Sequence, residues 1–156
     1  MKTSLLIIAF VALNYAFSQG TLTDDNSVLL EYDFAQEQGH TSIVLTGENY
    51  ELSKEDLKKV DKILSECISN NKSGQNNDFG RIGDKAYYYQ LLATKDTNGD
   101  VFVFINALNR ASIDSWNSKV SWREELKEVY DGGNSFWRVN IDLTNNSWSD
   151  LYVNGI

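Results

Sequence analysis

The chain has 156 residues, 42% of them hydrophobic and 23% charged, and its 22 acidic and 14 basic residues give a formal net charge of −8. This length and apolar share indicate one globular domain with its own core. The negative charge argues against nucleic acid and anionic membranes as partners. One Cys and one His cannot form an internal disulfide or a four-ligand zinc site, so we expect no metal and no other cofactor.

Residues 1–18 have the pattern of a secretory signal peptide, with Lys2 near the start, the apolar run 5–13 and a small-x-small motif ending at Ser18. The run is too short to span a bilayer, and no later segment reaches about 18 apolar residues. We therefore expect cleavage after Ser18. The product would be a single exported α+β domain, residues 19–156, in the periplasm or outside the cell, with a formal charge of −9 because Lys2 is lost.

Two β-rich stretches, 27–34 and 41–46, are predicted as strands. An amphipathic helix is predicted over about 53–70. Ser53 fits its N-cap and Asp56 follows three residues later, which is the spacing of a capping box. The apolar residues recur at intervals of three and four, so they form one stripe that faces a core. They are Leu57, Val60, Ile63, Leu64, Cys67 and Ile68.

A first β-hairpin is predicted by residues 87–94 and 101–108, which flank the turn-forming pair Asn98–Gly99. In 101–108 both alternating sets of side chains are apolar. This pattern is typical of a central strand that is covered on both faces.

A second hairpin is predicted near the end of the chain, where residues 136–143 and 148–154 flank a polar turn. In 136–143, Arg138, Asn140 and Asp142 alternate with apolar residues. In 148–154, alternation places Trp148, Asp150 and Tyr152 on one face, opposite Leu151 and Val153.

Residues 109–130 fit two structures. Ser121 and Glu124 are suited to opening a helix, whereas 126–130 equally fits a strand ahead of the turn at 131–134. In either case the pattern predicts an α+β fold, in which the helix at 53–70 packs on a curved antiparallel sheet of four or more strands.

Several stretches, taken together, resemble a group of small uncharacterised secreted proteins of Bacteroidetes. They are Tyr89-Gln90, Phe104-Ile105-Asn106, Asp131-Gly132-Gly133-Asn134 with Phe136, Asn140-Ile141-Asp142-Leu143-Thr144, and Val153-Asn154-Gly155. The resemblance covers about residues 53–156 and implies a secreted domain with a topology similar to cystatin-like and helix-grip folds. In that group a Cys follows the Ile-Asn and Gly-Asn pairs, where this chain has Ala107 and Ser135. The resemblance therefore implies that a disulfide is missing here, and it implies no activity.

Two motifs with possible site chemistry have simpler interpretations. Residues 96–100 carry oxygen ligands at alternate positions, like the start of a calcium loop, but Val101 and Ala107 replace the Gly and acidic residue that such a loop needs. We therefore interpret 96–100 as a hairpin turn. Cys67 lies in the apolar stripe of the predicted helix, far in sequence from His40, so we predict a buried thiol and not a nucleophile.

Carboxylate pairs offer an alternative function, because two facing acids can hydrolyse a glycosidic bond. The candidate pairs are Glu31 with Asp33, Glu124 with Glu125, and Asp142 with Asp150. Each pair also fits a solvated face of a strand or helix. A carboxylate-dependent hydrolase is therefore an alternative and not the preferred hypothesis.

Aromatic residues carry the preferred hypothesis. Tyr87, Tyr88 and Tyr89 are consecutive, so at least one ring points away from the helix-covered face, and Trp148 and Tyr152 are expected to share a face. Exposed aromatic rings beside acids and amides suit a surface that binds another protein or a carbohydrate. We expect a non-catalytic binding module with these five residues as its surface. A cystatin-like protease inhibitor is a further alternative, although the chain lacks the Gln-x-Val-x-Gly wedge of that family.

Overall fold

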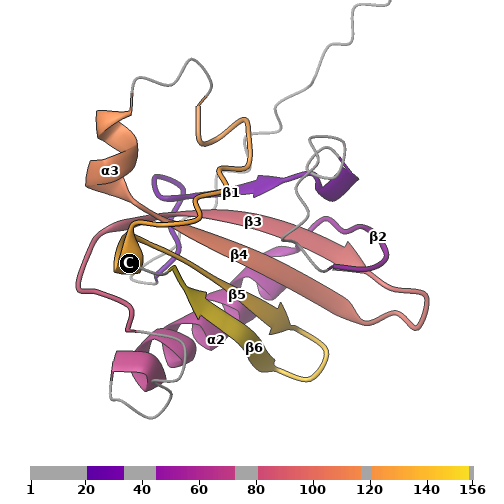
Figure 1. Cartoon of the computed structure of the whole chain (residues 1–156). Helices are drawn as coiled ribbons and strands as arrows, with labels where there is room; N and C mark the ends of the chain where they lie inside the picture. Colours follow the sequence, from indigo (N-terminus) through magenta and orange to yellow (C-terminus); the bar gives the residue numbers. More distant parts are fainter. Residues whose placement is uncertain (1–20, 34–44, 73–80, 117–120, 155–156) are drawn as a thin grey trace, which may run out of the picture.

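A computed structural model describes residues 21–33, 45–72, 81–116 and 121–154. In these ranges the chain has an α+β fold, in which one long helix packs against a six-stranded sheet (Figure 1). The predicted signal peptide, His40 and most of the predicted strand at 41–46 lie outside the described residues. None of the helices in the described ranges is long and apolar enough to cross a membrane.

In order along the chain, the elements are β1 (Ser27–Leu30), β2 (Glu48–Asn49), α2 (Lys54–Lys72), β3 (Tyr87–Lys95), β4 (Val101–Asn109), α3 (Arg110–Ser115), a 3-10 turn (Gly133–Ser135), β5 (Phe136–Asp142) and β6 (Ser147–Val153). The sequence order of the elements shows two hairpins, β3–β4 and β5–β6, separated by a long connection.

The predicted helix is confirmed as α2, and the capping box forms at its start. The Ser53 hydroxyl accepts a hydrogen bond from the Asp56 amide at 3.1 Å, and the Asp56 carboxylate accepts one from the Ser53 amide at 3.0 Å. Burial opposes the charged form of Asp56, but the hydrogen bonds that its carboxylate accepts from the Ser53 hydroxyl and the Ser53 amide outweigh it and lower the pKa of that carboxyl. Val60, Ile63 and Cys67 lie on the buried side of α2 and face the sheet.

Both predicted hairpins are confirmed. β3 and β4 pair along nine residues, from Tyr87 opposite Asn109 to Lys95 opposite Val101, and β5 and β6 form the second antiparallel pair. β4 also pairs with β5, so β4 lies in the middle of the sheet. The order of the five main strands is β1-β3-β4-β5-β6.

The first strand corrects the expected antiparallel sheet to a mixed one. β1 runs parallel to β3, with Ser27 opposite Tyr89 and Leu30 opposite Leu92, and β2 pairs antiparallel with the far end of β3. Parallel neighbours need a long crossover connection, and here α2 lies within the connection from β1 to β3. The predicted strand at 27–34 also stops early, because the chain enters a helical turn at residue 32.

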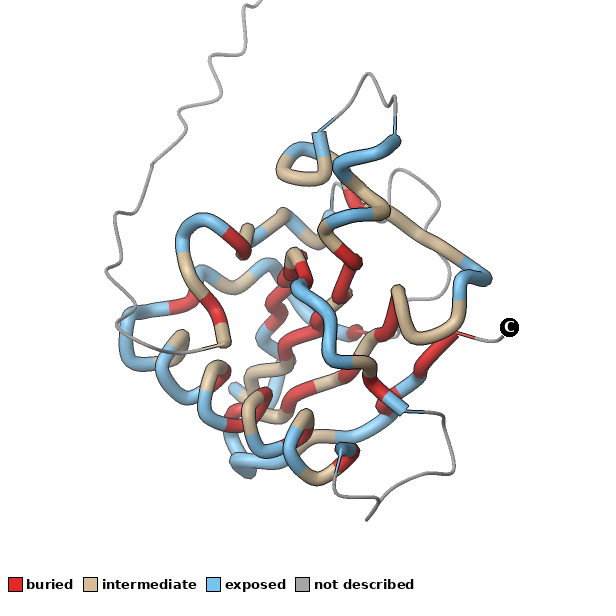
Figure 2. Tube along the Cα trace, turned by 90° about the vertical axis from the view of Figure 1, so that its left-hand side faces the viewer, coloured by how far each residue is buried: buried red, intermediate tan, exposed pale blue. Residues whose placement is uncertain are grey.

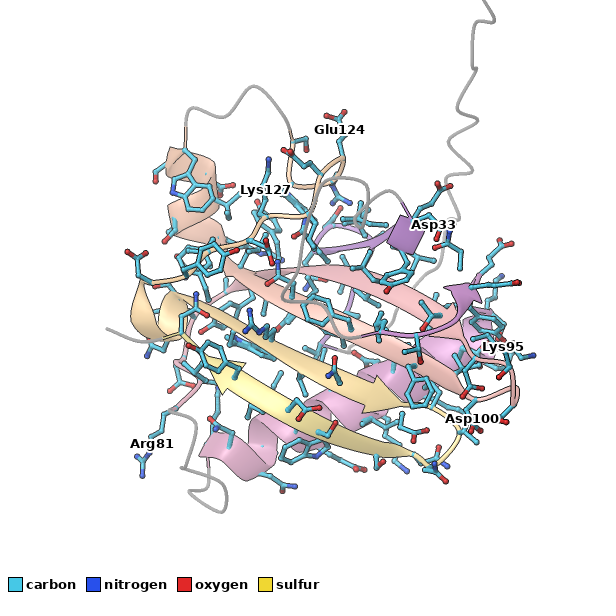
Figure 3. The ribbon with its side chains drawn as sticks, turned by 45° about the vertical axis from the view of Figure 1, so that its right-hand side comes forward. Asp33, Arg81, Lys95, Asp100, Glu124 and Lys127 are labelled. Atoms are coloured by element: carbon cyan, nitrogen blue, oxygen red, sulfur yellow. The ribbon has the colours of Figure 1, made fainter. Side chains whose placement is uncertain are left out.

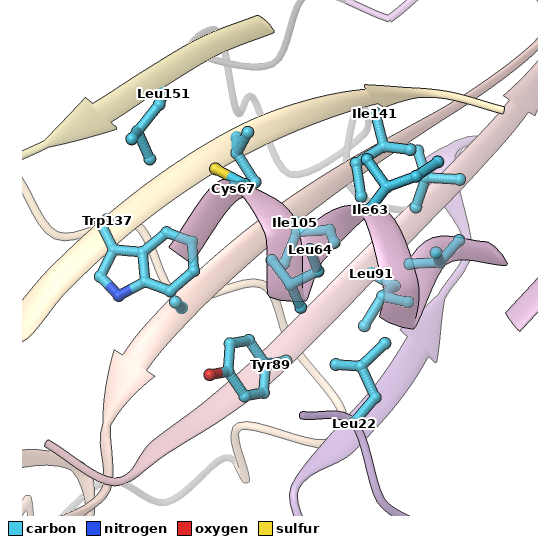
Figure 4. Packing of buried hydrophobic residues seen from close by; sticks show 14 of the residues in the cluster. Leu22, Ile63, Leu64, Cys67, Tyr89, Leu91, Ile105, Trp137, Ile141 and Leu151 are labelled. Carbon is cyan, nitrogen blue, oxygen red and sulfur yellow. The ribbon is translucent and has the colours of Figure 1, made fainter. Parts of the chain in front are cut away.

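The main core lies between α2 and one face of the sheet. Figure 4 shows Ile63, Leu64 and Cys67 of α2 among residues from the strands, including Ile105 and Trp137, all of them less than 4% exposed. Figure 2 shows the outward turns of α2 exposed to solvent and the strands beyond it largely buried. Packing in this layer accounts for most of the apolar burial of the domain.

The opposite face of the sheet is covered only in part. Leu45, Leu92, Phe104 and Leu126 form a second buried cluster there, with Phe102 packed against it. Leu126 belongs to residues 121–131, which we call the crossover segment because it crosses this face between α3 and β5. The β5–β6 part of the face remains more open.

The two structures expected for 109–130 are both corrected. Arg110–Ser115 forms the short helix α3, which Asn109 caps through its side chain, and residues 126–130 belong to no strand. Ser121 does start a turn, since its carbonyl accepts a hydrogen bond from the Glu124 amide at 3.0 Å, but no helix follows. Side-chain hydrogen bonds from the sheet hold the crossover segment, as described below.

Candidate functional site

Two of the predicted binding residues, Tyr87 and Tyr89, point into the main core. Each is 5% exposed, and each ring meets the Trp137 indole edge to face, with centroids 5.7 and 6.0 Å apart. Burial raises the pKa of both phenols. These rings stabilise the core and have no free face for a ligand.

Tyr88 points to the opposite face, as expected for a neighbour in a strand, and forms part of a four-layer stack. Its ring lies 4.3 Å from the Trp122 ring at an interplanar angle of 17°, and the Arg110 guanidinium lies 5.0 Å from the Tyr88 centroid. Arg123 covers the Trp122 ring at 4.3 Å. Both faces of the Tyr88 and Trp122 rings are therefore occupied within the protein.

Arg123 also fixes the N-terminal part of the described chain. Its guanidinium donates to the carbonyls of Asp24, Asp25 and Ser27 at 2.7 to 3.1 Å. The stack thus joins the start of the domain to β3 and the crossover segment, which gives Tyr88 a structural role.

Gln90 anchors the crossover segment and was missed by the sequence analysis. Its side chain is fully buried, and Nε2 donates to the carbonyls of Trp122 and Glu125 while Oε1 accepts from the Lys127 amide at 2.9 Å and from Asn106 at 2.9 Å. Figure 3 shows Glu124 and Lys127 on the segment that these bonds hold above the sheet. The sequence feature that could have revealed this anchor is a Gln in the middle of a largely apolar strand.

Trp148 and Tyr152 do not share a face, and this prediction is wrong. Asp150 adopts a left-handed backbone conformation with φ of 52°, and the pairing of β6 with β5 shifts between Arg138 and Asn140. Such a bulge adds a residue and breaks the alternation of side chains. Trp148 consequently packs against the main core, whereas Tyr152 is 42% exposed on the other face.

A small, partly enclosed hollow lies on this other face, between the crossover segment and β5. We call it the Arg138 hollow. It is lined by Phe104, Asn106, Leu126, Glu128, Val129, Trp137, Arg138 and Asn154. Tyr152, which pairs with Arg138 across the strands, and Tyr130, which is 72% exposed, lie beside it. Of the five predicted binding residues, only Tyr152 borders the hollow with an exposed ring.

Arg138 stacks on its cross-strand neighbour. Its guanidinium carbon lies 4.6 Å from the centroid of the Tyr152 ring. The charge of Arg138 also acts on the Tyr130 hydroxyl, which donates to the Glu128 carboxylate at 3.1 Å. The bond to Glu128 raises the pKa of Tyr130 despite the nearby Arg138. One cation, one carboxylate and two tyrosines thus meet at the edge of the hollow.

Two asparagines in the hollow have fixed orientations. Asn106 donates its amide hydrogens to Gln90 Oε1 and to the Lys127 carbonyl, and Asn154 donates to the carbonyls of Val129 and Asp131. All their N–H groups point to the protein, so each side chain presents its amide oxygen as the remaining polar atom.

The candidate carboxylate pairs are engaged in local structure. Asp33 accepts from the Asn49 side chain and Glu125 pairs with Lys127 at 2.6 Å. Asp142 accepts two bonds from Asn145, and Asp150 accepts from the Asn140 and Ser149 side chains. These contacts fit turns and strand faces and identify no pair around the Arg138 hollow.

The predicted turn at 96–100 is confirmed. The Asp96 carboxylate accepts from the backbone amides of Asn98 and Asp100 at 2.8 and 2.9 Å, and Gly99 has the φ of +92° that this turn requires. In Figure 3 this turn, marked by Asp100, lies at the end of the sheet away from Glu124. In the part of the chain that the structure describes, no group of His, Cys, Asp or Glu side chains is arranged to hold a metal ion.

Comparisons with protein-family models, with curated proteins and with solved structures find no match to this chain.

Proposed function

We propose that this protein is an exported, non-catalytic binding module whose ligand surface is the Arg138 hollow with the rings of Tyr130 and Tyr152. The observation that carries the proposal is the exposure of two large aromatic side chains beside a hollow that contains a cation. Tyrosine gives a large contact area at a low cost in conformational entropy, so exposed tyrosines are frequent in binding surfaces. The partner on this proposal is a carbohydrate or another protein.

Export is part of the proposal and is supported by the sequence of residues 1–18 and by the state of the thiol. Cys67 is buried, and burial raises its pKa to about 12. A thiol of this kind is protected from oxidation in an oxidising compartment, so the domain suits a periplasmic or extracellular location without a disulfide.

Lack of catalysis is proposed from the composition of the hollow. Glu128 is the one carboxylate among its lining residues, whereas a hydrolase of the paired-carboxylate type needs two. A cystatin-like topology, with a helix across antiparallel strands, is proposed for the α2 and β3–β6 part alone. Nothing in the hollow favours a protease inhibitor over another binding protein.

An array experiment tests the proposal. Wild-type protein and the variants Tyr152→Ala and Leu29→Ala are applied to glycan and peptide arrays. Leu29 is a matched control, because it is also 42% exposed but lies on β1, at the opposite edge of the sheet. We expect Tyr152→Ala to lose at least about tenfold in affinity, as for a central interface aromatic residue, and Leu29→Ala to bind like wild type. Equal binding by all three proteins would contradict the proposed surface.

A further inference from the structure

Arg138 differs from the other arginines and lysines that lie over this face of the sheet. Arg123 donates to three carbonyls, Arg110 donates to the Tyr87 carbonyl, and Lys127 pairs with Glu125. Among the described residues, nothing accepts a hydrogen bond from Arg138 or forms an ion pair with it; its guanidinium stacks on Tyr152, and its charge acts on the Tyr130 hydroxyl. The guanidinium thus lies over the Tyr152 ring, and none of the described residues accepts a hydrogen bond from its N–H groups.

The rest of the hollow complements these free donors. Asn106 and Asn154 are oriented by the hydrogen bonds of their N–H groups, so that amide oxygens remain as acceptors. Phe104 and Leu126 add an apolar floor, and the exposed Tyr130 and Tyr152 rings stand beside it. The hollow therefore offers donors for an anion, acceptors for hydroxyl groups and ring faces for an apolar surface.

We propose that the Arg138 hollow binds the carboxylate of a hydroxylated sugar ring, that is, a uronic acid residue at the end of a glycan. This inference rests on the proposed binding function and names its ligand class. A carboxylate can accept two parallel hydrogen bonds from a guanidinium, and the C–H face of a sugar ring can pack against tyrosine. The sugar hydroxyls donate to the asparagine oxygens.

Two other anions fit the hollow less well. The C-terminal carboxylate of a peptide is usually captured by free backbone N–H groups, but here the backbone of Arg138 lies between the paired strands β4 and β6. A polyanion would meet a single cation beside Glu128, on a chain with a net charge of −8. One carboxylate on a neutral scaffold matches one guanidinium.

An NMR titration with named probes tests this inference. The probes are methyl β-D-glucuronide, its neutral counterpart methyl β-D-glucoside, and N-acetylalanine as a carboxylate without a sugar. We expect the glucuronide to bind at least about tenfold more tightly than either other probe, because it alone combines a carboxylate for Arg138 with a sugar ring for the tyrosines. Equal affinity for the glucoside would overturn the proposed role of the carboxylate. Equal affinity for N-acetylalanine would overturn the proposed role of the sugar ring.

Variants of Arg138 test whether the glucuronide binds at the hollow. Arg138→Gln should reduce glucuronide affinity to that of the glucoside, and Arg138→Lys should retain part of it, because Lys keeps the charge and loses the planar fork. Arg81→Gln removes the same charge from an exposed position outside the hollow and should bind like wild type. Full glucuronide affinity in Arg138→Gln, with the thermal midpoint of wild type, would overturn the inference.

The array experiment distinguishes a failure of the proposed ligand class from a failure of the proposed binding function. Loss of array binding in Tyr152→Ala together with no preference for the glucuronide would leave the binding function and remove its proposed ligand class. Absence of any array ligand that depends on Tyr152 would remove both.

Discussion

Gln90 shows how one buried polar side chain can determine the structure of a segment far away in sequence. It has 0% exposure, and its amide satisfies two carbonyls and one amide of the crossover segment. Because the crossover segment has no regular structure of its own, these bonds replace a ladder of backbone pairs. The path of residues 121–131 over the sheet is therefore determined by a residue that lies about 30 to 40 positions earlier in the chain.

Replacing Gln90 should release this segment. Gln90→Leu keeps the size of the side chain but leaves the Trp122 and Glu125 carbonyls without donors, so we expect a loss of about 2–3 kcal/mol in the free energy of unfolding. Urea denaturation measures the loss, and hydrogen exchange should show faster exchange at residues 121–131.

Thr94 provides a matched control on the same face of the same strand. Its buried hydroxyl has no hydrogen-bond partner, so Thr94→Val removes an unsatisfied group and should leave stability unchanged or raise it by about 1 kcal/mol. A loss in Thr94→Val as large as that in Gln90→Leu would show that packing, and not the hydrogen bonds, sets the cost.

Cys67 should be inert in the folded protein. It is fully buried, and its pKa is raised to about 12, so the thiolate is scarce at pH 8. We expect a thiol reagent such as DTNB to react only after unfolding in urea. Ser69→Cys adds an exposed thiol two residues further along α2 and should react at once. Rapid modification of the wild-type thiol under native conditions would contradict its placement in the core.

At the scale of elements, the start of α2 carries a pH dependence. The pKa of Asp56 is lowered in the folded state, so its contribution is present above the unfolded value of 3.8 and is lost as the pH falls through the lower folded value. Asp56→Asn should therefore cost about 1 kcal/mol at pH 7, and the difference from wild type should shrink as the pH falls below 3.8.

Glu55 is the control for this measurement. It is exposed in the same first turn but makes no capping bond, so Glu55→Gln should cost only about 0.3 kcal/mol through the helix dipole. Thermal unfolding between pH 2.5 and pH 7 compares the three proteins. An Asp56→Asn deficit that stays constant over this range would contradict the assigned role of the carboxylate.

The bulge in β6 separates a core residue from a surface residue. Trp148 packs against the core, so Trp148→Ala should lose about 2 kcal/mol of stability, whereas Tyr152→Ala should change it by about 0.5 kcal/mol or less. Chemical denaturation of the two variants measures this difference. Equal losses would mean that the two rings are similarly buried and that the bulge at Asp150 is misplaced.

At the scale of the whole molecule, the sequence predicts those elements that depend on local patterns of residues. The helix at 53–70 and both hairpins follow from capping residues, apolar spacing and turn residues, and all three form. The alternation in β5 also placed Arg138 correctly, on the face away from Trp137.

The remainder depends on contacts that local patterns do not encode. The parallel pairing of β1 was available from the strand-helix-strand order, but the stretch 27–34 was predicted as a strand of a wholly antiparallel sheet. The bulge at Asp150 reverses the faces of β6, and no Gly marked it in the sequence. The Arg138 hollow needs the crossover segment as its second wall, so it became visible only with the fold.

At the scale of the whole molecule, we propose that ligand binds on the open side of the sheet, at Arg138, Tyr130 and Tyr152. An amide NMR titration with the glycan or peptide that gives the strongest array signal tests it most directly, because each backbone amide reports its own surroundings. We expect chemical-shift changes concentrated at residues 128–131, 138 and 152–154. Shifts concentrated on α2 or on the turn at 96–100, with none around Arg138, would contradict it.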